Sequence, residues 1–521
     1  MAPINDVITV KETNEIGAPT ATYIYSTTSE PTQFRTPDSS GVRHERRRVD
    51  IVQPSRKDSS SYLASLLNVF LPVGYPHSVS DDYLDCLGFA SGVLKFNCRT
   101  AGVPGWVGVG DASASPTVAL LHSVLQDSMG RIATILFAHR LGTSLEPECK
   151  MYRLAADVLN DSALIFDCLS PALPKRLRVV VLAFSSVLRA LCGVAAGSSK
   201  ASLSSHFAKC GNLGELNAVR FPNVLVIAIS GAAQRGFPFL FSDADQKLQK
   251  DSSQETVISL LGILCGSVVV SHISTPFATW TTLLLLLLVH LSTNYAAVRS
   301  VNMTTLNRQR TNIVFSTLFE KGSVLTPTEA SKCERIFERD GILRWKASSA
   351  TLGYCQIGGS FQELLRGSIH GANSIRDVGI DIYKLLRLFE KEEYVLWFNP
   401  IHKKGTIVLK NNVTPISQLQ AWSHALRVAK RLTDLRREGA GRINVSPVEK
   451  EEEEDKSKQR NESVSVTNLT DPDTMFSILE STLCAHSASF ADQIGMLTDA
   501  GWDVATPSLE TRPARRFQVV E

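Results

Sequence analysis

Two aspartates, Asp157 and Asp161, stand four residues apart in a stretch whose apolar and charged residues follow a helical period. This spacing places both carboxylates on one face of a helix, where like charges repel by roughly 0.2 to 0.5 kcal/mol if they are exposed. Such a pair requires a cation, a basic partner or water. In or near a bilayer the pair would be a functional candidate. In solvent it would be a plain polar face, and the residues leave both interpretations open.

Three further polar residues lie downstream of this pair. Arg189 sits in the middle of the apolar segment Val179 to Ala196. An arginine at a helix centre costs roughly 2.5 to 3.5 kcal/mol on insertion, whereas the apolar residues of the segment return roughly 3 to 5 kcal/mol. Insertion is therefore marginal, and it would be helped if Arg189 faced other helices. Lys200, after two serines, invites a Schiff-base interpretation, but a surface lysine explains it better, and His206 is more simply a structural histidine than a base.

Composition and missing motifs exclude several classes of function. The sequence has no P-loop, metalloprotease helix, zinc-ligand spacing or nucleophile elbow. Lys and Arg total 54 against 51 Asp and Glu, a balance too even for a nucleic-acid footprint. The ten cysteines include no Cys-x-x-Cys pair and are too sparse for a disulfide scaffold. Only 20% of residues are charged, below the roughly 25% typical of soluble domains, which favours contact with a membrane.

The segment most typical of a membrane protein lies near the middle of the chain. From Thr256 to Val298 there are 43 residues without Asp, Glu, Lys or Arg, including six consecutive leucines. Val257 to Ile273 and Phe277 to Ala297 each approach the roughly 20 residues that a spanning helix needs. The sequence therefore predicts a transmembrane hairpin broken at Pro276. A buried soluble hairpin is the alternative, because histidines, Asn294 and many hydroxyl residues dilute the apolar run.

The predicted fold class is mainly α: a helical membrane-associated domain with this transmembrane hairpin, followed by a smaller α+β C-terminal domain. The predicted organisation is a polar, partly disordered N-terminal extension (1–61), the helical membrane domain (62–325), the α+β domain (326–445 and 468–521) and an acidic disordered linker (446–467). Within the helical part, Lys150 to Leu169 is amphipathic, while Val118 to Leu125 and Ile132 to Phe137 are apolar runs too short to span. In the α+β part, periodicity predicts helices at Phe361 to Phe389, Ile416 to Leu435 and Asp473 to Ala500, and strands at Tyr394 to Phe398, Thr406 to Leu409 and Arg516 to Val520.

Several strings, taken together, closely resemble the root UVB sensitive (RUS) family, and the chain looks like a fungal-like member. They are Phe70 to Leu84, Gly108 to Ala112, Gly130 to Ile132, Ala156 to Asp161, Lys250 to Thr256, Asn294 to Arg299 and Asp499 to Trp502. The resemblance implies a membrane protein of unknown biochemical activity, connected in plants with ultraviolet-B responses and vitamin B6 homeostasis. It supplies no catalytic residues. The family position matching Lys200 is often arginine, which counts against a Schiff base there because arginine stays protonated.

Two parts of the chain depart from the family pattern. Asp85 to Val107 does not read like the helical stretch expected there. Val219 to Gln249 intervenes where Ala218 should be followed directly by Lys250. This insert is a whole number of codons whose possible boundaries resemble splice signals, so we predict a retained intron in the gene model. A genuine surface-loop insertion is the alternative.

Two functions are compatible with these residues. The first is an integral membrane protein, a non-enzymatic carrier or scaffold without a cofactor, in which Asp157, Asp161 and Arg189 face a polar path between helices. Its partners would be the lipid bilayer and a homologous RUS-family protein or a second copy, and no nucleic acid. The second is a soluble or peripheral enzyme or sensor that binds pyridoxal phosphate or another phosphorylated small molecule. Its polar contacts would be Lys200, His206, Asp251, Gln254 and Glu255.

Overall fold

The computed structural model describes residues 7–14, 19–28, 46–52, 116–207, 275–346, 350–366, 381–443, 472–513 and 515–520. The chain divides into two compact units. One unit combines Met1–Asp58 with Thr304–Glu521, and the other comprises Ser59–Met303. The second unit is therefore an insertion in the sequence of the first. The first arm of the predicted hairpin, Val257 to Ile273, and the predicted insert, Val219 to Gln249, lie outside the described residues.

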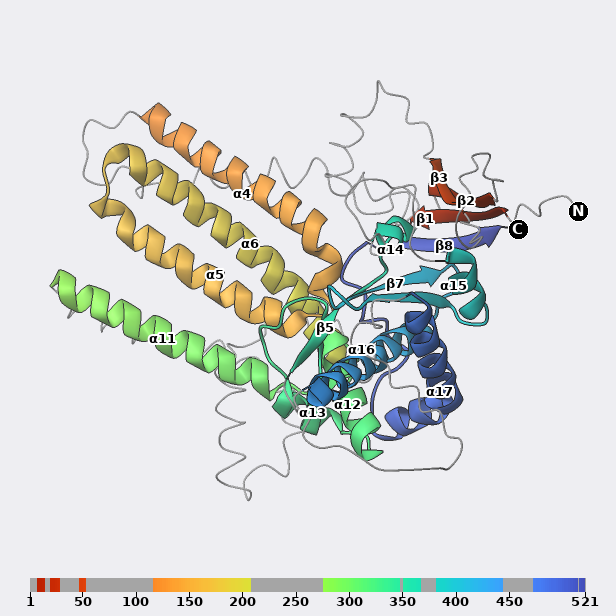
Figure 1. Cartoon of the computed structure of the whole chain (residues 1–521). Helices are drawn as coiled ribbons and strands as arrows, with labels where there is room; N and C mark the ends of the chain where they lie inside the picture. Colours follow the sequence, from red (N-terminus) through yellow and green to blue (C-terminus); the bar gives the residue numbers. More distant parts are fainter. Residues whose placement is uncertain are drawn as a thin grey trace, which may run out of the picture. The chain divides into compact units, whose positions relative to one another are not determined.

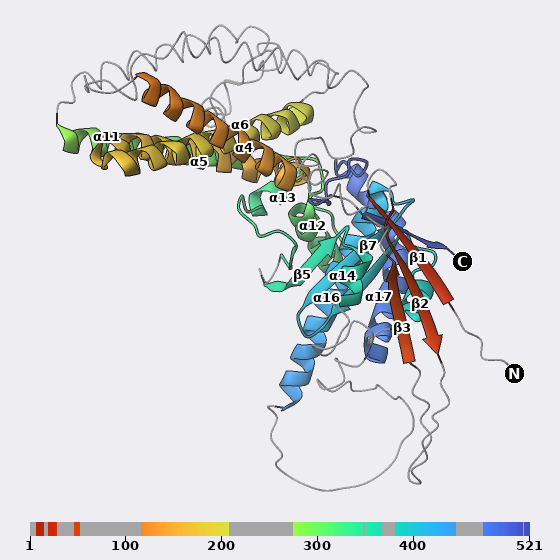
Figure 2. The same cartoon turned by 90° about the horizontal axis from the view of Figure 1, so that it is seen from above.

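The inserted unit is built from long helices. They are α4 (Pro116–Leu145), α5 (Cys149–Leu169), α6 (Lys175–Phe207) and α11 (Pro276–Ser300), with the short 3-10 turn Ser170–Ala172 between α5 and α6. Helix α6 lies between α4 and α5, and α11 packs on the other side of α5 (Figure 1). Seen from above, α5, α6 and α11 overlap, so they form a single layer (Figure 2). In the described part of this unit, most long apolar side chains therefore have no second layer to pack against.

Hydroxyl groups fix the close approach of neighbouring helices in this layer. Ser185 of α6 donates to the carbonyl of Ala163 on α5 at 3.0 Å, and Ser186 donates to Gln126 of α4 at 3.2 Å. Gly130 of α4 would place a Cβ 3.5 Å from that of Ala190, so the two backbones are nearly in contact. Small residues and hydroxyls of this kind are typical of helix interfaces in membranes.

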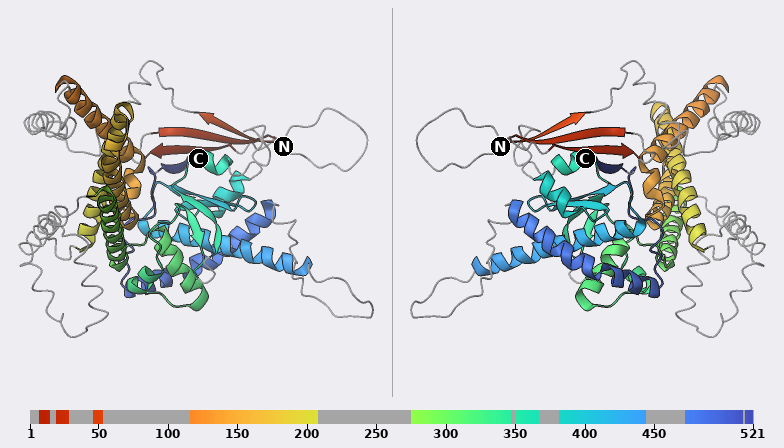
Figure 3. Two further views of the ribbon diagram at one scale, coloured as in Figure 1. Left: turned by 90° about the vertical axis from the view of Figure 1, so that its left-hand side faces the viewer. Right: turned by 90° about the vertical axis from the view of Figure 1, so that its right-hand side faces the viewer.

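The other unit contains an eight-stranded mixed sheet. Its strands are β1 (Val7–Asn14), β2 (Pro19–Thr28), β3 (Arg46–Val52), β4 (Ile342–Arg344), β5 (Thr351–Ile357), β6 (Tyr394–Asn399), β7 (Lys404–Lys410) and β8 (Arg515–Val520). The order is β3-β2-β1-β8-β7-β5-β4, with β6 paired to β7. Strands β7 and β8 pair only through Leu409 with Arg516 and Lys410 with Phe517. The sheet therefore consists of two four-stranded groups joined at one corner, and Figure 3 shows β1, β2 and β3 side by side near the C-terminus.

Helices pack against the strand group formed by β4, β5, β6 and β7. They are α12 (Arg308–Lys321), α13 (Pro327–Cys333), α14 (Phe361–Arg366), α15 (Ile382–Leu388), α16 (Pro415–Ile443) and α17 (Pro472–Asp499). Helix α13 begins with a capping box in which the side chains of Thr326 and Glu329 each bond the other residue's backbone N–H. Arg310 of α12 is buried and pairs with the buried carboxylate of Glu334 at 2.9 Å. This ion pair attaches α12 to the segment that follows α13.

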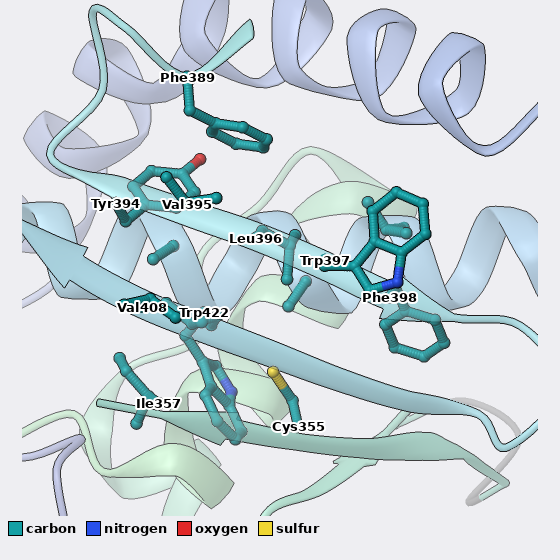
Figure 4. Packing of buried hydrophobic residues seen from close by; sticks show 14 of the residues in the cluster. Cys355, Ile357, Phe389, Tyr394, Val395, Leu396, Trp397, Phe398, Val408 and Trp422 are labelled. Atoms are coloured by element: carbon teal, nitrogen blue, oxygen red, sulfur yellow. The ribbon is translucent and has the colours of Figure 1, made fainter. Parts of the chain in front are cut away.

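The core of this unit is aromatic and centres on β6 (Figure 4). All six residues of β6 are buried. Tyr394 bonds His424 of α16 at 3.0 Å, while the ring of Trp397 lies 5.7 Å from that of Phe476 on α17. Since successive side chains of a strand point to opposite faces, both faces of β6 are covered, which explains its continuous apolar sequence. Trp422 of α16 is fully buried and donates to the side-chain oxygen of Asn312 at 2.9 Å.

The architecture confirms a mainly helical chain with a mixed sheet. The prediction that the α+β part is the smaller one is wrong, because β1, β2 and β3 of the predicted N-terminal extension join the sheet and make its unit the larger of the two. The predicted strands at Tyr394, Thr406 and Arg516 and the predicted helices at Lys150, Ile416 and Asp473 are present, with ends shifted by a few residues. Two short apolar runs predicted between Val118 and Phe137 belong to one helix, α4. The predicted Phe361 to Phe389 helix is represented by α14 and α15, and residues 367–380 between them lie outside the description.

Candidate functional site

A buried polar contact between α5 and α11 is the central feature of the candidate site. Asp161 of α5 is almost fully buried, and its Oδ2 lies 2.9 Å from Nδ1 of His290 on α11. The other ring nitrogen of His290, Nε2, lies 2.8 Å from the side-chain amide nitrogen of Asn294, one turn further along α11. Asn294 is itself buried. The three side chains form a continuous polar chain in which the imidazole bridges a carboxylate and an amide.

The arrangement of α11 explains why these polar groups face α5. Its buried residues Leu287, Asn294 and Val298 recur at intervals of seven and four, the spacing of one helical face. His290 lies within that stripe and is less than half exposed. The neighbouring leucines Leu284, Leu285, Leu286 and Leu288 are exposed instead. His290 and Asn294 of this apolar helix therefore lie on the side that contacts α5.

Asp157 lies one turn before Asp161 on the same helix and completes the polar face. Its Oδ2 is buried and has no hydrogen-bond partner among the described residues. Arg153 and His290 are the basic groups close enough to stabilise its negative charge, and Asp161 opposes it. A buried carboxylate oxygen without a donor is costly, because the water that it loses is not replaced. Asp157 therefore offers an acceptor that a cation or a ligand donor could satisfy.

The predicted candidate Arg189 belongs to a different contact. It lies on α6 and forms an ion pair with Asp167 near the end of α5, with about half of its side chain exposed. Among the described residues, its partner is Asp167 rather than Asp157 or Asp161. An exposed pair of this kind contributes little to stability. The structure therefore brings Asp157 and Asp161 together with His290, and leaves Arg189 outside this polar chain.

Of the remaining predicted candidates, the two that the structure describes, Lys200 and His206, do not join the polar chain. Lys200 and His206 both lie on α6 and are partly buried. Lys200 is eight residues beyond Cys192, the α6 residue on which Asp157 acts electrostatically, and this separation corresponds to about 12 Å along the helix. Asp251, Gln254 and Glu255 lie outside the described residues. No group of three or more His, Cys, Asp or Glu within the described ranges could hold a metal ion.

His290 and Asn294 are the site residues that sequence reasoning missed. In the sequence they only diluted the apolarity of the predicted spanning segment. They are spaced four apart, as are Asp157 and Asp161, so each pair lies on one face of its own helix. The signal that could have linked the two helices was this shared spacing, with one polar pair on a charged helix and one on an apolar helix.

Two helices of the described chain are long and apolar enough to cross a membrane. They are Leu177–Leu203 within α6 and Trp280–Ser300 within α11. Few side chains in either segment are buried. Four leucines of α11 are each more than half exposed: Leu284, Leu285, Leu286 and Leu288. Large contiguous apolar surfaces of this kind are typical of protein or membrane contact sites.

Comparison with known proteins matches the region that contains this site. Residues 56–233 and 247–322 match the family model described as "Vitamin B6 photo-protection and homoeostasis domain". The interruption at 234–246 falls inside the predicted insert, and whether that segment belongs to the mature protein stays a prediction. The matched region includes α4, α5, α6, α11 and α12.

Curated relatives extend the similarity. The chain is 32% identical over 298 residues to "RUS family member 1" of Dictyostelium discoideum, covering 56% of this chain and half the length of that relative. It is 29% identical over 373 residues to "Protein root UVB sensitive 3" of Arabidopsis thaliana, covering 70% of this chain and 75% of the relative. "Protein root UVB sensitive 5" of the same plant is 23% identical over 459 residues, 84% of this chain and 74% of that protein.

No solved structure matches the chain. The family model and the curated relatives agree with one another and with the strings from Phe70 to Arg299 that the sequence shares with the family. The chain therefore belongs to the root UVB sensitive (RUS) family.

Proposed function

We propose that this RUS-family chain is an integral membrane protein that acts as a carrier or scaffold without catalysing a reaction. Helices α6 and α11 cross the bilayer in this proposal. At 1.5 Å per residue, their apolar segments of 27 and 21 residues are about 40 and 31 Å long. The hydrocarbon core of a bilayer is about 30 Å thick. The predicted hairpin would add Val257 to Ile273 as a partner of α11.

The exposed leucines of α11 support contact with lipid. Full burial of one leucine side chain stabilises a protein by about 1.5 to 3 kcal/mol relative to exposure in water. Leu284, Leu285, Leu286 and Leu288 are 54 to 64% exposed. Lipid would remove this unfavourable contact with water without any rearrangement of the helix.

The polar chain Asp161–His290–Asn294 is the single observation that carries the functional proposal. Ionisable groups within membrane helices are costly and mark paths for solutes, ions or protons. Here a buried carboxylate meets a histidine of the apolar helix, next to a second carboxylate with an unpartnered oxygen. A solute with hydrogen-bond donors, or a cation, would find acceptors at Asp157 and Asp161. We propose that this contact is the solute path of a carrier.

The connection with vitamin B6 comes from the family. The matched domain is described in terms of vitamin B6 photo-protection and homoeostasis. We propose that the solute or process served by the chain belongs to vitamin B6 homeostasis. The chain spans half the length of its Dictyostelium relative. Its partners are proposed to be the lipid bilayer and a second RUS-family chain or a second copy of itself.

Membrane extraction tests the first part of the proposal. The tagged full-length chain should stay in the membrane pellet after alkaline carbonate and enter solution only with detergent. Hydrophobic contacts survive high pH, whereas peripheral contacts based on charge do not. Release by carbonate would reject the integral membrane assignment.

Substitution of the acid pair tests the second part. Asp157→Asn and Asp161→Asn together should abolish rescue of a strain that lacks its own family member, at unchanged protein level. Asp167→Asn is the matched control, because it makes the same change on α5 outside the polar chain. Rescue by the double variant would remove the pair from the mechanism. In proteoliposomes, uptake of labelled pyridoxal that depends on the pair would favour a carrier, and no uptake would favour a scaffold.

A further inference from the structure

The turn between β6 and β7 carries an unusual concentration of unpaired positive charge. From Asn399 to Lys410 the sequence has three lysines and a histidine but no acidic residue. Ile401, His402, Lys403 and Lys404 are all exposed. Neither Lys403 nor Lys404 forms an ion pair with any described residue. We define Pro400 to Lys404 as the basic turn.

Neighbouring segments add positive charge next to the basic turn. The guanidinium of Arg339 lies 5.1 Å from the centre of the Tyr354 ring, and Tyr354 is paired in the sheet with Lys404. Arg436 of α16 donates to the carbonyl of Pro400. The two acids that flank Arg339 in the sequence are already engaged, because Glu338 pairs with Arg344 and Asp340 pairs with Arg308. Arg339 and Arg436 therefore add positive charge to that of Lys403 and Lys404.

The basic turn is held in one conformation. The side-chain oxygen of Asn399 accepts from the backbone N–H groups of Ile401 and His402, both at 3.0 Å. The N–H of Tyr354 donates to the carbonyl of Lys403 at 2.8 Å. Gly353 permits this approach, since a Cβ there would lie 2.4 Å from the same carbonyl oxygen. Lys403 adopts a φ of 50°, a left-handed conformation that glycine occupies more easily.

The basic turn also contains an exposed aliphatic side chain, that of Ile401. Ile401 is 48% exposed, and Tyr354, which pairs with Lys404 in the sheet, is 38% exposed. Cations surrounding an aliphatic tip match the interface of an anionic membrane, where phosphates attract the cations and the apolar group enters the acyl boundary. Nucleic acid matches less well, because the whole chain carries a net charge of only +3 and phosphate contacts alone need no aliphatic tip.

We propose that the basic turn docks onto the anionic lipid headgroups of the membrane in which the chain resides. This inference rests on the proposed membrane location and adds a specific surface and lipid class to it. Each lysine or arginine near an anionic surface contributes roughly a fivefold increase in occupancy. Loss of Lys403 and Lys404 charge should therefore weaken the contact about 25-fold.

The test compares the full-length chain in nanodiscs of phosphatidylcholine alone and of phosphatidylcholine with phosphatidylserine. Hydrogen exchange of the peptide that contains Ile401 to Lys404 should slow several-fold in the anionic discs, and high salt should remove this protection. Lys403→Gln with Lys404→Gln should abolish it. Lys391→Gln is the matched control, because Lys391 is also exposed but lies at the opposite end of β6. Its variant should keep full protection.

Different outcomes separate the two proposals and the alternative ligand. If the protein is embedded in both kinds of disc but hydrogen exchange of the turn is equal in both, the docking proposal is overturned and the membrane proposal stands. Failure of the chain to stay in phosphatidylcholine discs would instead reject the proposed membrane insertion. Ile401→Ser should reduce protection by anionic discs. Unchanged protection in Ile401→Ser, together with equal protection by soluble RNA, would reject lipid docking and assign the turn to polyanions.

Discussion

His424 and His486 are stacked at the centre of the α16–α17 interface and are both fully buried, with ring centres 5.8 Å apart. His424 bonds Tyr394 and Thr482, while His486 bonds Ser423 at 3.0 Å. Burial lowers the pKa of His424 well below its usual range and lowers the pKa of His486 to about 3. Both rings are therefore neutral in the folded protein at neutral pH. Neither is accessible to a substrate, so their role is to stabilise the core.

This burial predicts that the unit with the sheet loses stability in acid. An unfolded histidine takes up a proton near pH 6.5, whereas the folded ones do not until the pH is much lower. Stability is therefore complete above about pH 6.5 and falls as the pH decreases towards 3, by up to about 1.4 kcal/mol per pH unit for each histidine. His486→Gln should reduce this slope by about half.

Denaturant unfolding followed by tryptophan fluorescence, at a series of pH values in detergent, checks this prediction. His402→Gln, the same change at an exposed position of the basic turn, should leave the slope as in the parent protein. A slope in His486→Gln equal to that of the parent protein would contradict the assignment of acid sensitivity to the stacked pair.

Single residues of the candidate site differ in whether the sequence could identify them. Asp157 and Asp161 were recognisable because two carboxylates four residues apart lie on one face of an amphipathic helix. His290 was not, because its role depends on Asp161, 129 residues earlier in the chain. Local spacing identifies polar faces of single helices, but it does not tell which two faces meet. Arg189 was predicted as a site residue and does not belong to the polar chain. Its partner is Asp167, which was not among the predicted site residues.

Among the elements, local patterns predicted β6, β7, α16 and α17, but they did not predict β1. Strands β6 and β7 are joined by a short turn and have a continuous apolar sequence, both local signals. Strand β1 instead pairs with β8, some 500 residues away. Its inward residues are Ile8, Val10 and Glu12, and a buried glutamate disguises the alternation. Glu12 accepts a hydrogen bond from Tyr23 at 2.8 Å, so it is buried with a partner.

The pairing of β1 with β8 predicts that the N-terminal strands are an integral part of their unit. Val10 is 1% exposed, while its neighbour Lys11 is exposed. Val10→Asp would bury a second carboxylate beside Glu12 and should destabilise the unit by at least about 3 kcal/mol. Lys11→Asp adds a carboxylate to the opposite face and should change stability by no more than about 0.5 kcal/mol. Urea unfolding of the two variants, side by side, gives the comparison, and equal stabilities would mean that β1 does not contribute to the core.

For the whole molecule, the family match and the structural units have different ends. The family model extends to residue 322, but the inserted unit ends at Met303. Helix α12 lies in the difference, and Val314 and Phe315 of that helix are fully buried in the core around the sheet. The sequence alone does not show that α12, the helix after the apolar helices, packs in the other unit. The similarity to an Arabidopsis relative, over 459 residues and 84% of this chain, extends into both units.

The division into units predicts that the unit with the sheet folds without the inserted helices. Met1–Asp58 and Thr304–Glu521 share one hydrophobic core that includes Tyr23, Phe361 and Phe517. A variant in which a flexible glycine–serine linker replaces residues 59–303 should therefore be soluble without detergent and monodisperse in gel filtration. It should keep the acid sensitivity caused by His424 and His486, because those residues and their partners all lie within this unit. Val10→Asp in this variant should abolish the folded signal in circular dichroism. Aggregation of the parent variant, relieved only by detergent, would show instead that the helical insertion is required for the sheet to fold.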